Sequence, residues 1–342
     1  METVKKTMAE NLGGPAHDLA SGDQAFSLDE VPDLSGKVAL VTGGSEGIGF
    51  GCSHTLIQHN IAKLFILSQR EEKIEDAYKA IDEEFGQGTS QKMVWLQCDL
   101  SDWEQTAETA KKIKNQTDKL DIVINNAARG IMTQQFAPSN GIDLHMASNH
   151  MGHVVLTSHL LPLLKKTAEA GNTVRIVNLA SNMHQNAPKE TAFASVDELQ
   201  KDYGPVGQYG RTKLATLLYS KYLARHLTAT HPNILANATH PGVVDTAQTN
   251  EHVHEPYPIL GYGMSLGLKP FRKTQFQGCV STMYAATACE KSGLYVTPPK
   301  IVEEGSPAAN DMEMAERLMK LTREVVDEKT GAGKKGCPLK DY

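Results

Sequence analysis

The chain has 342 residues, a length that allows one large domain or two small ones. Hydrophobic residues make up 40% of it and charged residues 22%, which is ordinary for a soluble protein with a full core. The net charge of −6 argues against a surface for nucleic acid or anionic membranes, although it leaves room for a local basic pocket. The five cysteines are scattered and form no C-x-x-C pair, so they predict neither a disulfide framework nor a zinc site, and a reducing compartment fits them best.

The sequence predicts a cytoplasmic protein without a transmembrane segment. No apolar run reaches the ~18–20 residues that span a bilayer. The longest candidate, around Val154 to Leu164, contains His159 and Pro162. The first residues have no apolar stretch and no arginine, which makes them a poor secretory or mitochondrial signal.

Residues 1–33 are polar and contain several glycines and prolines, so we interpret them as an arm or loop, with regular structure starting at Lys37. Short apolar runs then alternate with longer helical stretches. The expected strands are 38–42, 63–68, 92–97, 120–125, 173–179, 234–239 and 293–297. Most of these runs are continuously apolar, which indicates a parallel sheet covered on both faces. We therefore predict an α/β fold: one doubly wound Rossmann domain with a mostly parallel seven-stranded sheet over residues 34–300.

Two segments break this rhythm. Residues 250–275 are dense in apolar side chains within an irregular stretch, which suggests a substrate lid and hence a lipophilic substrate. The alternative is a surface helix that packs on the core or on a membrane face. Residues 301–342 form a C-terminal extension with a helical piece from Asp311 to Lys329 and a Gly/Lys-rich end that we interpret as a frayed terminus.

A glycine-rich turn follows the first expected strand, which ends at Thr42, and precedes a helix. Glycines permit a tight turn and let backbone N–H groups approach a pyrophosphate at the helix N-terminus. The strand–turn–helix context favours a dinucleotide site over a turn without a ligand. The candidate contacts here are Gly43, Ser45, Glu46, Gly47, Ile48 and Gly49.

The second expected strand ends in Ser68-Gln69-Arg70. An NAD-binding protein places Asp or Glu here, about twenty residues after the glycines, for the ribose hydroxyl. No carboxylate occurs before Glu71, and the guanidinium fork of Arg70 suits a 2′-phosphate, so we predict NADP(H) rather than NAD(H) as the cofactor. The alternative is that Arg70 opens a charged helix and pairs with Glu71 or Glu75.

Asp99 and Leu100 follow the third expected strand. The Asp99 carboxylate could hold the adenine amino group. Equally, Asp99 could belong to the turn, with Ser101 or Asp102 as the N-cap of the next helix.

After the fourth strand, Asn125, Asn126 and Ala127 suit a tight strand exit beside a ligand, although a plain turn would look similar. Further on, Asn149 lies inside an apolar helical stretch, where Asn is unfavourable. His150 and His153 beside it offer two metal ligands at most, with no local carboxylate or cysteine partner, so we expect no metal site.

Ser181 lies just past the fifth strand, and Tyr209 and Lys213 lie at positions i and i+4 of a helical stretch. That spacing places the phenol and the ammonium on one helix face. A phenol with a pKa of about 10 is a poor acid at neutral pH, and we expect the neighbouring cation to lower that pKa.

The sixth strand is followed by THPGVVDT. Pro241 and Gly242 turn the chain at a sheet edge where a ligand should lie, and Val244 and Thr246 complete the candidate cofactor contacts. Thr246 could reach a phosphate or an amide.

In order and spacing, these motifs resemble the short-chain dehydrogenase/reductase family, in the subgroup with a Thr-Gly-x-x-x-Gly-x-Gly turn. The matching residues are Thr42, Gly43, Gly47 and Gly49 for the turn, Asn149, Ser181, Tyr209 and Lys213 for the catalytic tetrad, and Pro241, Gly242 and Thr246 for the segment that closes over nicotinamide. Asn125-Asn126-Ala127 fits the family's Asn-Asn-Ala-Gly, except that Ala128 replaces glycine. The resemblance covers roughly residues 34–298.

The stretch from Ser181 to Tyr209 is longer than the family's usual gap. It is similar to the retinol-dehydrogenase-like branch, which includes the oxidoreductase domain of the WW-domain proteins, and to a group of fungal oxidoreductases. Ala180 departs from the Ser-Ser common there, but the catalytic second position is kept as Ser181.

The resemblance implies a carbonyl–alcohol oxidoreductase in which Ser181 and Tyr209 polarise the substrate oxygen and Tyr209 is the general acid/base. It further implies that Lys213 holds the nicotinamide ribose and that Asn149 positions a water linking Lys213 to solvent. A homodimer through helices around 143–166 and 207–227 is a further family expectation. The rival hypotheses are an NADP(H)-binding redox sensor with little turnover, against which the intact tetrad argues, and an epimerase or dehydratase, whose usual glycine spacing this chain does not have.

Overall fold

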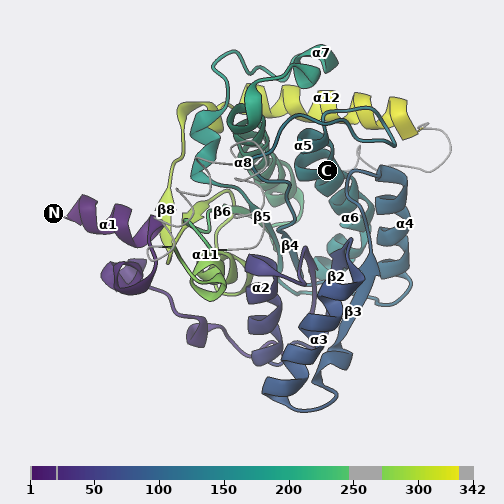
Figure 1. Ribbon diagram of the computed structural model, residues 1–342. Coiled ribbons are helices and arrows are strands. Elements are labelled where there is room, and N and C mark those ends of the chain that lie inside the picture. The colour runs from purple at the N-terminus through teal and green to yellow at the C-terminus, as the bar shows by residue number, and fades with distance from the viewer. Residues whose placement is uncertain (1, 21, 246–271, 331–342) are drawn as a thin grey trace.

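A computed structural model describes residues 2–20, 22–245 and 272–330 of the chain (Figure 1). The expected lid at 250–275 lies outside the described residues except for 272–275, and so does Thr246.

The centre of the molecule is one eight-stranded sheet in the order β3-β2-β1-β4-β5-β6-β7-β8. Its strands are β1 (Val38–Thr42), β2 (Lys63–Ser68), β3 (Met93–Gln97), β4 (Ile122–Asn125), β5 (Val174–Leu179), β6 (Ile234–Thr239), β7 (Tyr295–Thr297) and β8 (Ile301–Glu303). All neighbouring pairs are parallel except β7 and β8. The predicted α/β fold is therefore confirmed, but the expected seven strands were one too few. β8 is a three-residue strand inside the predicted C-terminal extension, too short to give a strand pattern in the sequence.

Helices cover both faces of the sheet (Figure 1). One layer holds α2 (Gly47–Gln58), α3 (Glu71–Phe85) and α11 (Gln275–Thr287), and the other holds α4 (Trp103–Lys114), α6 (His153–Glu169) and α8 (Gly204–Thr230). Two short helices, α5 (Leu144–Met146) and α7 (Val196–Gln200), lie in connecting segments. The strand order reverses between β1 and β4, and ligands of such sheets bind at the carboxyl ends of the strands beside that reversal.

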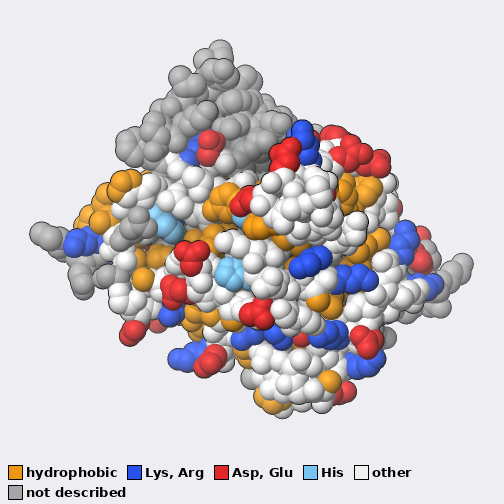
Figure 2. Space-filling view, turned by 90° about the horizontal axis from the view of Figure 1, so that it is seen from below, with side chains coloured by type: hydrophobic (Ala, Val, Ile, Leu, Met, Phe, Trp, Pro, Cys, Tyr) orange, Lys and Arg blue, Asp and Glu red, His pale blue; other side chains and the backbone are white. Residues whose placement is uncertain are grey.

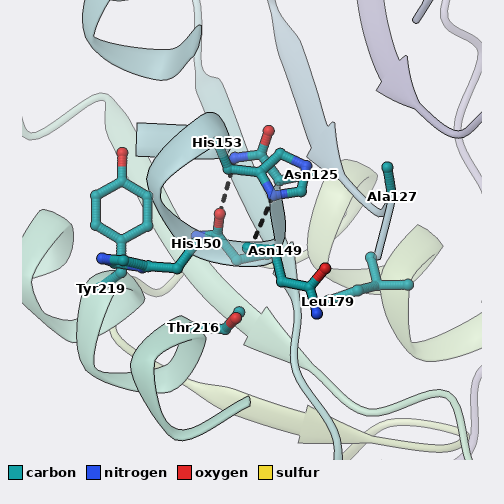
Figure 3. A pocket seen from close by; sticks show the side chains of 9 residues that line it. Asn125, Ala127, Asn149, His150, His153, Leu179, Thr216 and Tyr219 are labelled. Atoms are coloured by element: carbon teal, nitrogen blue, oxygen red, sulfur yellow. Dashed lines mark hydrogen bonds between the residues drawn. The ribbon is translucent and has the colours of Figure 1, made fainter. Parts of the chain in front are cut away.

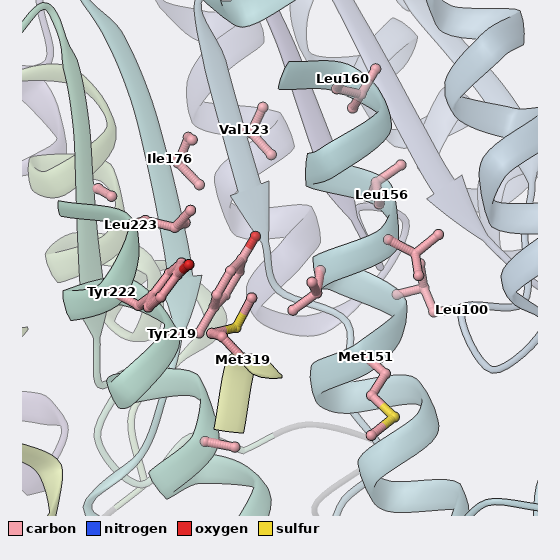
Figure 4. Close-up of a cluster of buried hydrophobic side chains, with 14 of the residues drawn as sticks. Leu100, Val123, Met151, Leu156, Leu160, Ile176, Tyr219, Tyr222, Leu223 and Met319 are labelled. Atoms are coloured by element: carbon pink, nitrogen blue, oxygen red, sulfur yellow. The ribbon is translucent and has the colours of Figure 1, made fainter. Parts of the chain in front are cut away.

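The C-terminal helix α12 (Met312–Thr330) matches the expected helical piece and packs against α8. Met319 of α12 lies against Tyr219 and Tyr222 of α8 in the larger of the two buried clusters (Figure 4). Residues 151–161 and 210–220 are buried without interruption in the single chain. The two helices expected to form a homodimer therefore use most of their apolar side chains within their own core.

The N-terminal arm is not a loop. It contains α1 (Glu2–Asn11) and three 3-10 turns, η1 (Gly14–Leu19), η2 (Gly22–Gln24) and η3 (Leu28–Glu30), so regular structure starts well before Lys37. α1 lies beside β8 (Figure 1), where Lys6 and Glu303 form an ion pair. Few hydrophobic residues of α1 are buried, so its sequence gave no sign of this contact.

On the face shown in Figure 2, acidic and basic side chains are interspersed rather than gathered into a field of one sign. Among the described residues, no helix is long and apolar enough to cross a bilayer.

Candidate active site

The glycine turn after β1 has the backbone that a phosphate site needs. Gly43 and Gly47 have φ of +63° and +55°, which favour glycine. A Cβ on Gly49 would lie 2.0 Å from the carbonyl oxygen of Gly43, so the turn tolerates no side chain there. Glu46, the N-cap of α2, makes no side-chain hydrogen bond to the first turn of that helix. The N-terminal end of α2 thus fits the pyrophosphate of a dinucleotide.

Thr42 ties this turn to the end of β4. Its Oγ1 accepts hydrogen bonds from the backbone N–H groups of Asn126, at 2.9 Å, and Ala127, at 3.0 Å. The Asn126 side chain returns a hydrogen bond to the Thr42 carbonyl oxygen at 2.8 Å. These hydrogen bonds therefore hold the ends of β1 and β4 together at the carboxyl edge of the sheet.

Arg70, predicted to bind a 2′-phosphate, is the N-cap of α3 and forms an ion pair with Glu46. The two side chains are 47% and 39% exposed, so this pair contributes little to stability. Because Glu46 is the N-cap of α2, this pair brings the guanidinium of Arg70 to a residue of the candidate phosphate site.

Asp99 lies in a turn, as its alternative interpretation predicted. Its Oδ1 accepts from the backbone N–H and the hydroxyl of Ser101, both at 2.8 Å, and Asp102 is the N-cap of α4. Leu100 is buried beside it. This carboxylate is held at the carboxyl end of the sheet by its own turn, and its contact with adenine stays a prediction.

The side chains of Ser181 and Tyr209 lie near each other, although the two residues come from different elements. Ser181 follows β5 and caps the 3-10 turn η6 (Asn182–Asn186), and Tyr209 and Lys213 lie on α8. The Lys213 Nζ donates to the Leu179 carbonyl oxygen at 2.7 Å and lies 5.4 Å from the centre of the Tyr209 ring. Three of the four predicted catalytic residues thus share one site.

The expected lowering of the tyrosine pKa is wrong for this arrangement. Burial raises the pKa of Tyr209 to about 12, and the hydrogen bond from Ser181 opposes this only in part. Burial also lowers the pKa of Lys213 to about 8. Burial disfavours the charged phenolate, so the phenol is protonated at neutral pH.

Asn149, the fourth predicted catalytic residue, lies in a π-helical turn, η5 (Ala147–Gly152), and such turns occur often at functional sites. Its side chain pairs with the backbone of Arg129, accepting from the N–H at 2.6 Å and donating to the carbonyl oxygen at 2.9 Å. A cavity of about 10 Å³, enough for about one water, lies beside Asn149, His150 and Leu179 (Figure 3). Its position is compatible with the water that the family resemblance implies.

His153 joins Asn149 to the glycine turn. The Thr42 hydroxyl oxygen accepts from two backbone N–H groups, so its own proton is directed to His153 Nε2, at 2.9 Å. The proton of His153 is then on Nδ1, which donates to the Asn149 carbonyl oxygen at 3.1 Å (Figure 3). Burial lowers the pKa of His153 to about 4, so the ring is neutral. The sequence analysis considered His153 only as a metal ligand. Its i+4 spacing from Asn149 could have indicated the hydrogen bond between these two residues.

Two residues that the sequence did not single out, His184 and Lys273, also hold segments of the site. His184 Nδ1 donates to the Ser181 carbonyl oxygen at 2.7 Å, while its Nε2 accepts from the Ser306 N–H at 3.0 Å. After β6, Gly242 has a φ of +79°, and Val244 pairs with Lys273 in an isolated parallel bridge. The predicted turn at Pro241–Gly242 therefore has the conformation that glycine favours.

The fold and this group of residues define a Rossmann-type oxidoreductase. The chain belongs to the short-chain dehydrogenase family, whose model matches residues 37–256. It is 51% identical to an oxidoreductase of Neurospora crassa, bli-4, described as mitochondrial, over 100% of this chain and 84% of that protein. It is 28% identical to retinol dehydrogenase 14 of Mus musculus, over 93% of this chain and 92% of that one. Both findings confirm the predicted family and its retinol-dehydrogenase-like and fungal relatives.

Polyprenol dehydrogenase of Danio rerio is 31% identical over 80% of each protein. Among solved structures, a protein from Mycobacterium paratuberculosis has a TM-score of 0.67 at 23% identity, covering 88% of this chain and 97% of that one. RhlG of Pseudomonas aeruginosa in an active-site complex with NADP has a TM-score of 0.57 at 24% identity, covering 78% of this chain and 96% of that one. At this identity the solved structures establish the fold.

Proposed function

We propose that the protein is an NADP(H)-dependent oxidoreductase that interconverts a carbonyl and an alcohol on a lipophilic substrate. The observation that carries this proposal is the meeting of the Ser181 and Tyr209 side chains, with Lys213 Nζ 5.4 Å from the centre of the tyrosine ring. Two hydroxyls that meet at the carboxyl end of a parallel sheet can both hydrogen-bond to one substrate oxygen.

In the direction of reduction, Ser181 and Tyr209 bind the carbonyl oxygen and stabilise the negative charge that develops on it. Tyr209, protonated at neutral pH, gives its proton to that oxygen as the general acid. The cofactor, when bound, supplies the hydride. Lys213 stabilises the phenolate that remains. Asn149 holds the backbone at Arg129 and lines the candidate water site. Oxidation uses the same residues, with Tyr209 as the base.

The cofactor would be held by residues that follow the five strands β1, β2, β3, β4 and β6 in the sequence, and by Tyr209 and Lys213 of α8. They are Gly43, Ser45, Glu46, Gly47, Ile48, Gly49, Arg70, Asp99, Leu100, Asn126, Ala127, Tyr209, Lys213, Pro241, Gly242, Val244 and Thr246. The pairing of Arg70 with Glu46, the N-cap of α2, favours NADP(H), because a 2′-phosphate there would replace Glu46 as its partner. The solved structure of RhlG with NADP is in keeping with this preference.

A lipophilic substrate is supported by two relatives whose names specify long apolar alcohols, polyprenol dehydrogenase and retinol dehydrogenase 14. The apolar composition of residues 250–275 agrees with it. Localisation to the cytoplasm stays a prediction, and the mitochondrial description of the Neurospora relative makes organelle fractionation its direct test.

Activity screens with NADPH and NADP⁺ against retinoid, steroid, polyketide and aliphatic carbonyl or alcohol panels test the function. We expect turnover on an apolar substrate and a loss of about 10²–10³ in kcat for Ser181→Ala. Tight NADPH binding with no turnover on any panel would favour the redox-sensing alternative instead.

A further inference from the structure

The N-terminal arm contacts the candidate site through the last residue of α1. Asn11 Oδ1 accepts hydrogen bonds from Asn182 Nδ2 at 3.2 Å and from His240 Nε2 at 3.5 Å. Its backbone carbonyl oxygen accepts from the Val243 N–H at 3.1 Å. Asn182 follows Ser181 directly, and His240 and Val243 flank Pro241–Gly242. One residue of the arm therefore bridges the catalytic serine segment and the turn expected to face nicotinamide.

The direction of each hydrogen bond in this bridge is fixed. His240 Nδ1 accepts from the Asn182 backbone N–H at 3.3 Å, so the ring proton is on Nε2 and points to Asn11. The Asn11 amide nitrogen donates to the Thr7 carbonyl oxygen at 3.0 Å, which leaves the side-chain oxygen for Asn182 and His240. Asn11, Asn182 and His240 thus form a closed ring that only an acceptor at position 11 completes.

A second contact fixes the same turn. Lys273, fully buried, donates from Nζ to the Ala9 carbonyl oxygen at 2.7 Å, and its backbone N–H donates to the Val243 carbonyl oxygen at 2.8 Å. A Cβ on Gly242 would lie 2.7 Å from the Glu10 carbonyl oxygen, so the arm and the turn are in van der Waals contact.

The contacts of α1 are not those of a helix that stabilises a core. Ala9 is its one buried hydrophobic residue within the described chain, while Val4 and Met8 are exposed. The helix is held by polar contacts, which are the Lys6–Glu303 ion pair with β8 and, at its last residues, hydrogen bonds to the segments around Ser181 and Pro241–Gly242. Loss of these contacts should therefore move the site more than it destabilises the fold.

We propose that the N-terminal arm helps to form the active site. In this proposal Asn11 is a positioning residue for the Ser181–Asn182 and His240–Val243 segments. The inference rests on the proposed function, since it assumes that the turn after β6 contacts the cofactor. Coupling of this kind is reciprocal: if the arm strengthens cofactor binding, the cofactor strengthens docking of the arm by the same factor.

The first test compares NADPH binding by fluorescence titration in the full chain and three variants. Asn11→Leu removes the acceptor at similar size and should weaken NADPH about tenfold, the effect of one or two hydrogen bonds. Asn11→Asp keeps the acceptor oxygen and should stay within about threefold of the wild type. Thr7→Ala, on the same helix, removes a hydroxyl that bonds only within α1 and serves as the control.

The second test needs no substrate. NADP⁺ should slow hydrogen exchange at the backbone amides of residues 2–17 in the wild type, and this protection should be lost in Asn11→Leu. If Asn11→Leu lowers the melting temperature but binds NADPH like the wild type, the arm is only structural and the inference is rejected. Unchanged exchange in the arm on NADP⁺ binding rejects it as well. A wild type that does not bind NADPH at all rejects the proposed function, and the inference with it.

Discussion

In the cofactor half of the site, which comprises residues 42–49, 70, 99–100 and 126–127, backbone geometry holds the arrangement. Glycines with positive φ and the N-terminus of α2 do so within one short stretch of chain, and the Thr42 hydroxyl ties this stretch to Asn126 and Ala127. In the catalytic half, side chains from segments distant in the sequence hold the arrangement. This half comprises residues 149, 181, 209, 213 and 241–244. Asn182 is held by Asn11, 171 positions away, and His184 by Ser306, 122 positions away. The glycine turn at the centre of the cofactor half is thus a local motif, whereas the catalytic half depends on the completed fold.

Gly49→Ala is the strongest way to break the cofactor half. The new methyl group would lie 2.0 Å from the Gly43 carbonyl oxygen and 2.5 Å from Asn126 Nδ2, so the turn must open. We expect NADPH affinity to fall by about two orders of magnitude or more, since the helix N-terminus no longer faces the phosphates. Gln58→Ala, at the exposed far end of α2, is the control, and equal affinity in both variants would show that the turn does not bind the cofactor.

His153→Asn tests a link that joins the two halves. Asparagine can still donate to the Asn149 carbonyl oxygen, but it does not reach Thr42. We expect about a tenfold loss in kcat with a smaller change in the KM for NADPH, because positioning around Asn149 is disturbed. His150→Asn is the matched control, since that buried ring bonds to Thr322 instead.

A double-mutant cycle of Thr42→Val with His153→Asn sharpens this test. The two substitutions should be less than additive if one hydrogen bond couples them. Fully additive effects on kcat would separate the two halves and remove the link.

These contacts also show how far the sequence could predict the site. The strands, the glycine turn, and Ser181, Tyr209 and Lys213 were predictable because each has a local pattern, a continuous apolar run or a fixed spacing. Asn11, His184 and β8 were not, because their partners lie more than a hundred residues away or their element is too short. The Tyr209 pKa was misjudged for a related reason: burial depends on the whole fold, and spacing shows only the nearby charge.

Arg70→Ala and Glu46→Gln test cofactor choice in opposite directions. Removal of Arg70 should weaken NADPH about tenfold and leave NADH nearly unchanged, since only NADPH carries the 2′-phosphate. Glu46→Gln should strengthen NADPH about two- to threefold, because a neutral side chain competes less for Arg70. Equal losses for both cofactors in Arg70→Ala would remove the 2′-phosphate role.

The pH dependence of kcat/KM for reduction should follow the ionisation of the Lys213 ammonium. Its pKa is lowered to about 8, so the ammonium loses its charge as the pH rises through that value, whereas Tyr209 stays protonated to about 12. We expect kcat/KM to fall as the pH rises above 8, by up to about tenfold per pH unit. Lys213→Arg, whose cation does not titrate in this range, should lose this dependence. A wild-type profile that is flat up to pH 10 contradicts the assignment.

The most direct test of the account is single-turnover hydride transfer in Tyr209→Phe, followed by stopped-flow loss of NADPH absorbance. Tyr203→Phe is the matched control, since Tyr203 caps the same helix and its ring contacts with Lys201 and Arg211 do not need the hydroxyl. With the phenolic proton removed, hydride transfer should slow by about 10²–10⁴-fold while the Kd for NADPH stays within about twofold. Hydride transfer at the wild-type rate in Tyr209→Phe would contradict the account.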